Sequence, residues 1–149
     1  MTFYHFFIQA TFSYLGTFTF GLFINLPKKA LNISSLIGMV GWILYWFIFK
    51  FGYGSILGNY LAALLVGLLG IIFSFKKAMP STMFSSGLVP LVPGASGYQA
   101  LSAFINGETV LAISKTTHVA MVAGAIALGY VTAQMIVDLV NKKKKNSVS

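Results

Sequence analysis

Apolar residues dominate five long stretches of the chain, and charged residues fall only between or beyond them. The stretches cover residues 1–27, 30–49, 51–75, 78–107 and 116–137, and none of them contains Lys, Arg, Asp or Glu. A helix needs roughly 20 mostly apolar residues to cross the hydrocarbon of a bilayer. The pattern therefore predicts an all-α polytopic membrane bundle of five spans, with four spans as the alternative.

The fourth stretch is interrupted by residues 87–98, which contain two prolines and three glycines. Pro90 and Pro93 each remove an amide donor and clash with the preceding helical turn. Membrane segments tolerate such a break where protein or a water-filled cavity covers the freed backbone. We expect half-helices at 82–88 and 95–105 joined by an unwound turn near mid-membrane. The alternative is a proline-kinked helix packed on its neighbours.

The other four stretches predict continuous helices. We expect the first at residues 3–26 and the third at residues 55–75. The second is expected to begin near Leu36, because Asn32, Ser34 and Ser35 offer capping side chains before it. The fifth is expected at residues 116–139, where a run of lysines ends it.

Composition supports a membrane protein and excludes several other classes. Only 8% of the 149 residues are charged, against about 25% in soluble domains. The length predicts a single membrane domain over residues 1–149, ending in a basic cytoplasmic tail at 141–149. The chain has no cysteine, which excludes disulfides and cysteine metal sites. It also has no Arg, the residue that suits phosphate recognition, so we expect no nucleic-acid partner.

The positions of the lysines predict the topology. With five spans and the N-terminus outside, eight lysines lie inside and two outside, whereas four spans give five on each side at best. Positive residues in short loops favour the cytoplasmic side. We therefore predict a multi-pass protein of the plasma or inner membrane, with its C-terminus in the cytoplasm. The eight inner lysines are Lys28, Lys29, Lys76, Lys77 and Lys142 to Lys145.

The break in the fourth stretch predicts a substrate site. The second half-helix would begin with unpaired amides and the positive end of its dipole, which together attract a carboxylate or another anion. Discontinuous helices of this kind build substrate sites in many transporters. The candidate substrate-binding residues are Pro90, Pro93, Gly94, Ser96, Gly97, Tyr98 and Gln99.

Two further residues are candidates for ion coupling. Glu108 follows Asn106 and Gly107 at the outer end of the fourth stretch, and its simpler interpretation is a solvated loop residue. His118 lies near the outer end of the fifth stretch, and histidine side chains exchange protons near neutral pH. The sequence contains no catalytic constellation and no metal-ligand spacing, so we expect neither an enzyme nor a cofactor.

Small and polar residues within the apolar stretches predict helix packing. Glycine and alanine recur four residues apart, which lets helices of this chain or of another chain approach closely. Gln9 is expected to face a partner or a cavity, and Asn25 and Asn59 are expected to bond between helices. The small-residue pairs include Gly54 with Gly58, Gly58 with Ala62, Ala63 with Gly67, and Ala120 with Gly124.

Three motifs resemble the threonine/serine exporter family, specifically its small split subunit, which is similar to the C-terminal half of full-length members. The strongest is Pro90-Leu-Val-Pro93-Gly94 followed by Tyr98. The exit of the first stretch, Phe23-Ile-Asn-Leu-Pro27-Lys-Lys, and the segment Gly38-Met-Val-Gly41-Trp42 followed by Tyr45 are also similar to that family. The resemblance covers most of the chain.

The resemblance implies export of small hydrophilic metabolites. Threonine and serine are the family's named substrates, and split pairs are also associated with succinate, so the resemblance implies a small carboxylate metabolite and a larger membrane subunit as partners. It also implies energy coupling by proton antiport. Two other functions stay open, namely a scaffold subunit that does not transport and a channel formed by a homo-oligomer.

Overall fold

The computed structural model describes residues 2–146, and every regular element in that part of the chain is a helix. The helices are connected by turns of a few residues. In chain order they are α1 (Thr2–Phe23), α2 (Lys28–Lys50), α3 (Ser55–Lys77), the 3₁₀ helix η1 (Ser81–Leu91), α4 (Gly94–Ile105) and α5 (Thr109–Asn146).

The predicted all-α polytopic bundle is confirmed. Within residues 2–146, four helices, α1, α2, α3 and α5, are long and apolar enough to cross a membrane. A fifth span is present if η1 and α4 count as one crossing, and these two helices meet at a bend of 53°. The predicted break therefore lies where the two prolines placed it, between Leu91 and Gly94.

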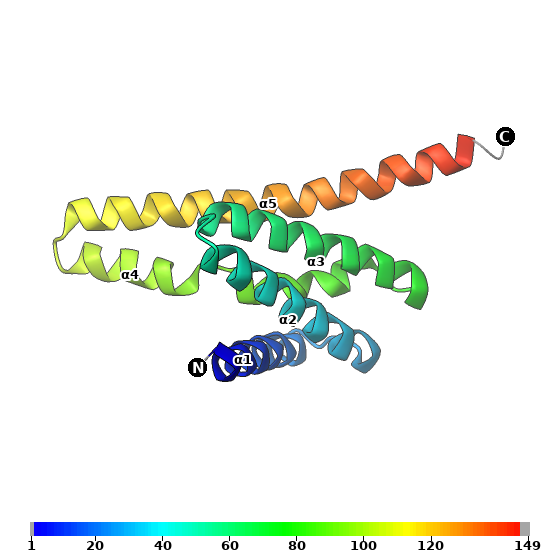
Figure 1. Cartoon of the computed structure of the whole chain (residues 1–149), viewed down its shortest axis with the longest axis horizontal. Coiled ribbons are helices and arrows are strands. Elements are labelled where there is room, and N and C mark those ends of the chain that lie inside the picture. The colour runs from blue at the N-terminus through cyan, green and yellow to red at the C-terminus, as the bar shows by residue number, and fades with distance from the viewer. Residues whose placement is uncertain (1, 147–149) are drawn as a thin grey trace.

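The helices form a bundle in which α2 is central (Figure 1). α2 packs against α1, α3 and η1, while α3 packs along α5. α3 and α5 run in the same direction, and η1 with α4 runs back beside them. The hairpin of α4 and the start of α5 extends past the beginning of α3. α1 is seen almost along its axis in the same view, so it crosses α3 and α5 at a steep angle.

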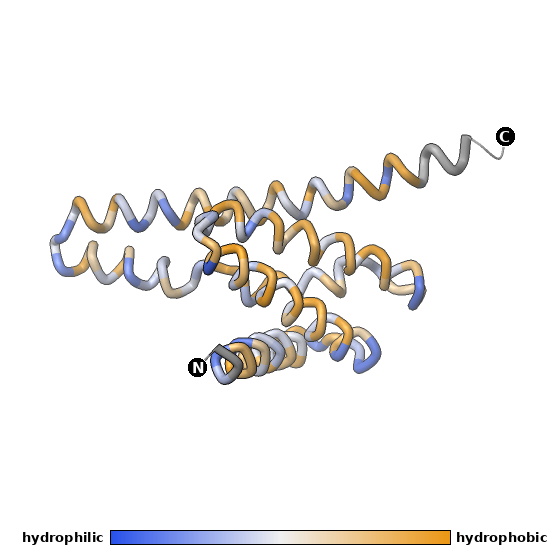
Figure 2. The backbone as a smooth tube through the Cα atoms, in the orientation of Figure 1, coloured by the Kyte–Doolittle hydropathy of each residue, from blue (hydrophilic) through white to orange (hydrophobic). Residues whose placement is uncertain are grey.

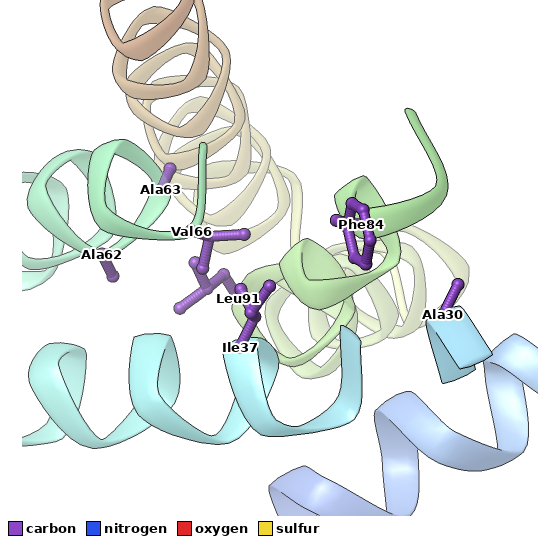
Figure 3. Close-up of a cluster of buried hydrophobic side chains, with 7 residues drawn as sticks. All are labelled: Ala30, Ile37, Ala62, Ala63, Val66, Phe84 and Leu91. Carbon is purple, nitrogen blue, oxygen red and sulfur yellow. The ribbon is translucent and has the colours of Figure 1, made fainter. Parts of the chain in front are cut away.

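Apolar residues cover both the inside and the outside of this bundle. Figure 2 shows them along the helices, with hydrophilic residues at the turns. Large side chains such as Phe12 and Val110 are 71% and 84% exposed, which suits contact with lipid. The buried cluster between α2, α3 and η1 is drawn in Figure 3 and consists of Ala30, Ile37, Ala62, Ala63, Val66, Phe84 and Leu91.

Two predicted boundaries near the start of the chain were wrong. α1 ends at Phe23 because the chain turns at Asn25, whose φ is 56°. α2 begins at Lys28 rather than near Leu36, directly after Pro27. The predicted capping serines lie inside the helix, where the Ser35 hydroxyl donates to the Leu31 carbonyl at 2.8 Å. A serine that bonds the carbonyl four residues earlier is compatible with a helix interior.

The broken segment and the last helix also differ from prediction. The first half of the break is a 3₁₀ helix, and it is longer than the predicted half-helix at 82–88. α5 begins at Thr109 and continues to Asn146, so the lysine run does not end it. Lysine is a good helix former. The proposed basic tail is therefore helical up to Asn146, and its last residues, 147–149, lie outside the described part.

Close helix packing at small residues is confirmed for part of the predicted set. A Cβ atom added to Gly67 would lie 2.7 Å from the Cβ of Ala133, so α3 and α5 are in close contact there. A Cβ atom added to Gly58 would lie 3.0 Å from the ring of Tyr45, so α2 and α3 are also close there. In contrast, no atom lies within 4 Å of the Cβ position of Gly124, so the pair it forms with Ala120 does not pack within the described part of this chain.

Candidate functional site

The candidate site starts from the unwound link between η1 and α4. Pro90 lies inside η1, and Pro93 precedes the first residue of α4. The Gly94 amide donates to the Val92 carbonyl at 2.8 Å, and the first helical bond of α4 runs from the Gly97 amide to the Pro93 carbonyl at 3.0 Å. The prolines thus stop one helix and start the next, as their missing amides require.

Two amides at the start of α4 remain unpaired. Within the described chain, the N–H groups of Ala95 and Ser96 have no backbone acceptor. No atom lies within 4 Å of the Cβ position of either Gly94 or Gly97, so the backbone here is accessible. Unpaired amides and the positive end of a helix dipole make this point suitable for an anion.

A cavity of about 200 Å³ lies beside these amides. Five helices, α2, α3, η1, α4 and α5, and the link contribute to its lining, with polar residues from α3, α4 and α5. It lies beside the first turns of α3 and toward the end of α2, rather than beside the middle of these helices. Its lining residues include Trp42, Tyr45, Ser55, Asn59, Pro90, Pro93, Gly94, Ser96 and His118.

The polar side chains of α3 and α5 are partly bonded to one another. Ser55 Oγ and His118 Nε2 are 2.9 Å apart. Asn59 donates from Nδ2 to the Ser55 carbonyl at 2.8 Å, one turn earlier in the same helix. Its Oδ1 is buried and has no hydrogen-bond partner in the described structure. The prediction that Asn59 bonds between helices was therefore wrong.

The sequence model of the threonine/serine exporter ThrE matches residues 9–136, which is most of the chain. The chain belongs to the threonine/serine exporter family. It is accordingly a multi-pass membrane protein of a transporter family. No solved structure matches the exporter chain.

The predicted substrate-binding residues of the exporter separate into two groups. Pro90, Pro93, Gly94 and Ser96 line the cavity. Gly97, Tyr98 and Gln99 do not belong to its lining. Among these three, the Tyr98 side chain is 73% exposed, and Gln99 Oε1 accepts a hydrogen bond from Lys115 Nζ at 2.9 Å.

The two candidate coupling residues of the exporter also separate. His118 lines the cavity and contacts Ser55. Glu108 is exposed at the turn between α4 and α5, where its amide donates to the Ala103 carbonyl at 2.9 Å. Groups of three or more His, Asp or Glu side chains that could hold a metal ion do not occur among the described residues.

Among the lining residues that sequence reasoning missed, four have polar or aromatic side chains, namely Trp42, Tyr45, Ser55 and Asn59. Asparagine in an apolar stretch is a signal that is visible in the sequence, because polar groups in lipid need partners. Ser55 carries no comparable signal. Trp42 and Tyr45 stood out only as part of a family motif, since Trp and Tyr are common near the ends of membrane helices.

A second cavity of the exporter, of about 210 Å³, lies on the α1 side of the break. It is lined by Gln9, Phe12 and Ser13 of α1, and it shares Trp42 and Pro90 with the first cavity. Trp42 donates from Nε1 to Gln9 Oε1 at 2.7 Å. The indole ring and Pro90 therefore stand between two cavities, and Gln9 faces a cavity as predicted.

Proposed function

We propose that this chain is a membrane subunit of a secondary exporter for small carboxylate-bearing metabolites, and that the cavity beside the break binds their carboxylate. One observation carries the proposal: the unpaired amides of Ala95 and Ser96 begin a helix beside a cavity in an otherwise apolar protein. Charged side chains are costly in a membrane, whereas backbone amides supply positive potential without a charge.

The size of the cavity favours a small metabolite. About 200 Å³ is below the roughly 300–1,000 Å³ of pockets for drug-sized ligands. Threonine or serine, which the family name indicates, and a dicarboxylate such as succinate are the two substrate classes we propose. The Ser96 hydroxyl can add a donor to the carboxylate held by the amides.

We propose that transport proceeds by alternating access around the break. In the proposed orientation Lys28 and Lys77 mark the cytoplasmic end of the bundle, and the cavity beside Ser55 and Asn59 lies toward the opposite end. A substrate that passes to the α1 side must displace the wall formed by Trp42 and Pro90. The bend between η1 and α4 is a natural hinge for this movement, because helices bend where proline removes hydrogen bonds.

His118 is the coupling residue that the arrangement supports. It lines the cavity beside Ser55, whereas Glu108 lies on the outer turn. Proton transfer at His118 would change the charge next to a bound carboxylate. His118→Gln is expected to weaken the dependence of export on the proton gradient. Export driven by the substrate concentration gradient alone should be retained.

The larger membrane subunit is the partner we propose. The apolar windows of α1 and α5 are only 22% buried within this chain, and Gly124 on α5 has no close neighbour. Small residues on an uncovered helix face let a second helix approach in lipid. If the chain were only a scaffold, its deletion would lower the abundance of the larger subunit and leave transport per larger subunit normal.

The test is efflux of labelled threonine and labelled succinate from proteoliposomes, with and without the larger subunit. Replacing Pro90 and Pro93 by alanine and Gly94 by leucine restores amide donors to the link and fills its open side. We expect membrane insertion to be kept and export to be lost. Gly97→Leu is the matched control, because it is equally open and lies outside the cavity lining. Unchanged export in the triple variant would contradict the site.

A further inference from the structure

We infer that Asn59 is a specificity-determining residue that accepts a hydrogen bond from a donor group of the substrate. This inference rests on the proposed function, because it concerns the same cavity. It adds a second polar contact, opposite in character to the amides of α4, and it assigns a role to a side chain within α3. A ligand with both an acceptor end and a donor end would use both contacts.

The chemistry of Asn59 is fixed by its neighbour. Its side chain is 3% exposed and lies in the cavity lining. The Ser55 carbonyl can only accept, so the Asn59 atom that is 2.8 Å from it must be the donor Nδ2. Oδ1 is therefore the free atom, and it is an acceptor with no partner among the described residues. Buried polar atoms without partners are rare in folded proteins, so this one needs an explanation.

The neighbouring side chains do not satisfy Oδ1. The Trp42 indole N–H donates to Gln9 in the second cavity. Ser55 Oγ and His118 Nε2 are bonded to each other. The Tyr45 hydroxyl also belongs to a lining residue, and no hydrogen bond joins it to Asn59. An incoming donor is thus the group that completes this site.

The amides at the start of α4 and the Oδ1 atom of Asn59 can distinguish ligands of equal size. Threonine and succinate have the same number of non-hydrogen atoms, so the cavity volume does not separate them. Threonine carries a carboxylate for the amides of Ala95 and Ser96 and an ammonium group for Asn59 Oδ1. Succinate presents acceptor oxygens at both ends, and its second carboxylate would face another acceptor. A site that hydrogen-bonds a substrate N–H strongly rejects an analogue that lacks it.

The experiment measures binding to the purified exporter complex by equilibrium dialysis with labelled threonine and labelled succinate. Asn59→Leu removes the acceptor with little change in size. We expect its affinity for threonine to fall about tenfold or more, because the ammonium loses its partner, and its affinity for succinate to stay or rise. Asn59→Asp keeps an acceptor oxygen and should retain threonine binding while weakening succinate further.

A matched variant controls the experiment. Asn32→Leu changes an exposed asparagine of α2 that bonds Tyr14 at 3.5 Å and lies outside the cavity lining, and it should leave both affinities unchanged. The ratio of the two affinities within one preparation does not depend on the amount of folded protein.

Every outcome decides the inference. Loss of threonine preference in Asn59→Leu, and not in Asn32→Leu, supports it. Equal affinities in wild type and Asn59→Leu, or equal losses for both ligands, would overturn it, as would a wild-type complex that binds no threonine. Binding that depends on Asn59 without efflux from proteoliposomes would instead contradict the proposed export function and leave the role of Asn59 intact.

Discussion

The two halves of the broken segment are packed in opposite ways. η1 is enclosed by α1, α2 and α3, and its Phe84 is fully buried. A Cβ atom added to Gly87 would lie 3.1–3.3 Å from three atoms of α2. α4 packs mainly against α5, and the Cβ positions of Gly94 and Gly97 are open. One half therefore holds the break in place, while the other half exposes its backbone.

This difference has a physical basis in the sequence of the two halves. η1 brings small residues, Ser86 and Gly87, against Ser34 and Gly38 of α2, so the backbones approach closely. Such approach replaces the hydrophobic drive that lipid does not provide. α4 directs Tyr98 and other large side chains outward. Its accessible start can therefore bind a ligand without disturbing the packing of η1.

The largest expected effect comes from filling the enclosed glycine. Gly87→Leu places a side chain against backbone atoms of Ser34 and Gly38, which cannot move without displacing α2. We expect a loss of about 3 kcal/mol in the free energy of unfolding, at the upper end of typical overpacking costs. Gly97→Leu, at an open position, should change it by less than about 0.5 kcal/mol. Thermal unfolding in detergent would measure both, and equal effects would show that η1 and the start of α4 are packed equally tightly.

A smaller effect is expected from the hydroxyl pair that joins η1 to α2. Ser34 Oγ and Ser86 Oγ are buried and hydrogen-bonded to each other. Ser34→Ala should lower the free energy of unfolding by about 1–2 kcal/mol, because the buried Ser86 hydroxyl then keeps only its long bond to the Met83 carbonyl at 3.3 Å. A double-mutant cycle with Ser86→Ala measures the coupling, and the double variant should lose less than the sum of the single losses. Strict additivity would show that the two hydroxyls do not hold η1 on α2.

Substitutions at the junction between the two halves should change the free energy of unfolding less. Trp42→Phe keeps an aromatic ring between the cavities and removes the N–H group that bonds Gln9 at 2.7 Å. We expect a loss of about 1 kcal/mol, the usual contribution of one hydrogen bond. Gln9→Leu should lower the free energy of unfolding by the same amount. The double variant Trp42→Phe with Gln9→Leu should lower it by no more than either change alone. Additive losses would show that Trp42 and Gln9 contribute to stability independently of each other.

Much of the fold was predictable because it depends on local sequence. The five uncharged stretches and the proline break follow from residue type alone, and the helices form there. The start of α2 and the length of α5 were not predicted correctly. In both cases polar residues that often flank helices, Ser34 and the lysine run, lie within one. Ser35, next to Ser34, bonds the Leu31 carbonyl within α2, and the helix propensity of lysine lets α5 continue.

Only the part of the site that is formed by contiguous residues was predictable from the sequence. Pro90 to Ser96 are contiguous, and their break was visible. Asn59 and His118 join them through helix packing, which a single sequence does not reveal. Tyr98 was predicted on sequence proximity, but it lies about 200° around α4 from Ser96 at 3.6 residues per turn. It therefore points away from the cavity that Ser96 lines.

The smallest effect is expected at Gln99, and it tests how far the open half of α4 contributes to binding. Its Oε1 is bonded to Lys115 on the exposed side of the α4–α5 pair, outside the cavity lining. Gln99→Ala should change the free energy of unfolding by less than about 0.5 kcal/mol, as exposed polar pairs do. Threonine efflux should stay within about twofold of wild type, because the site ends one turn earlier on α4.

Ser96→Ala is the matched change on the same helix, inside the cavity lining. It removes a hydroxyl from the proposed carboxylate contact and should slow threonine efflux several-fold with no loss of stability. If Gln99→Ala slowed efflux as much as Ser96→Ala, the exposed face of α4 would take part in transport. The binding surface would then extend from the break along α4 to Lys115, and the open half would do more than present its first amides.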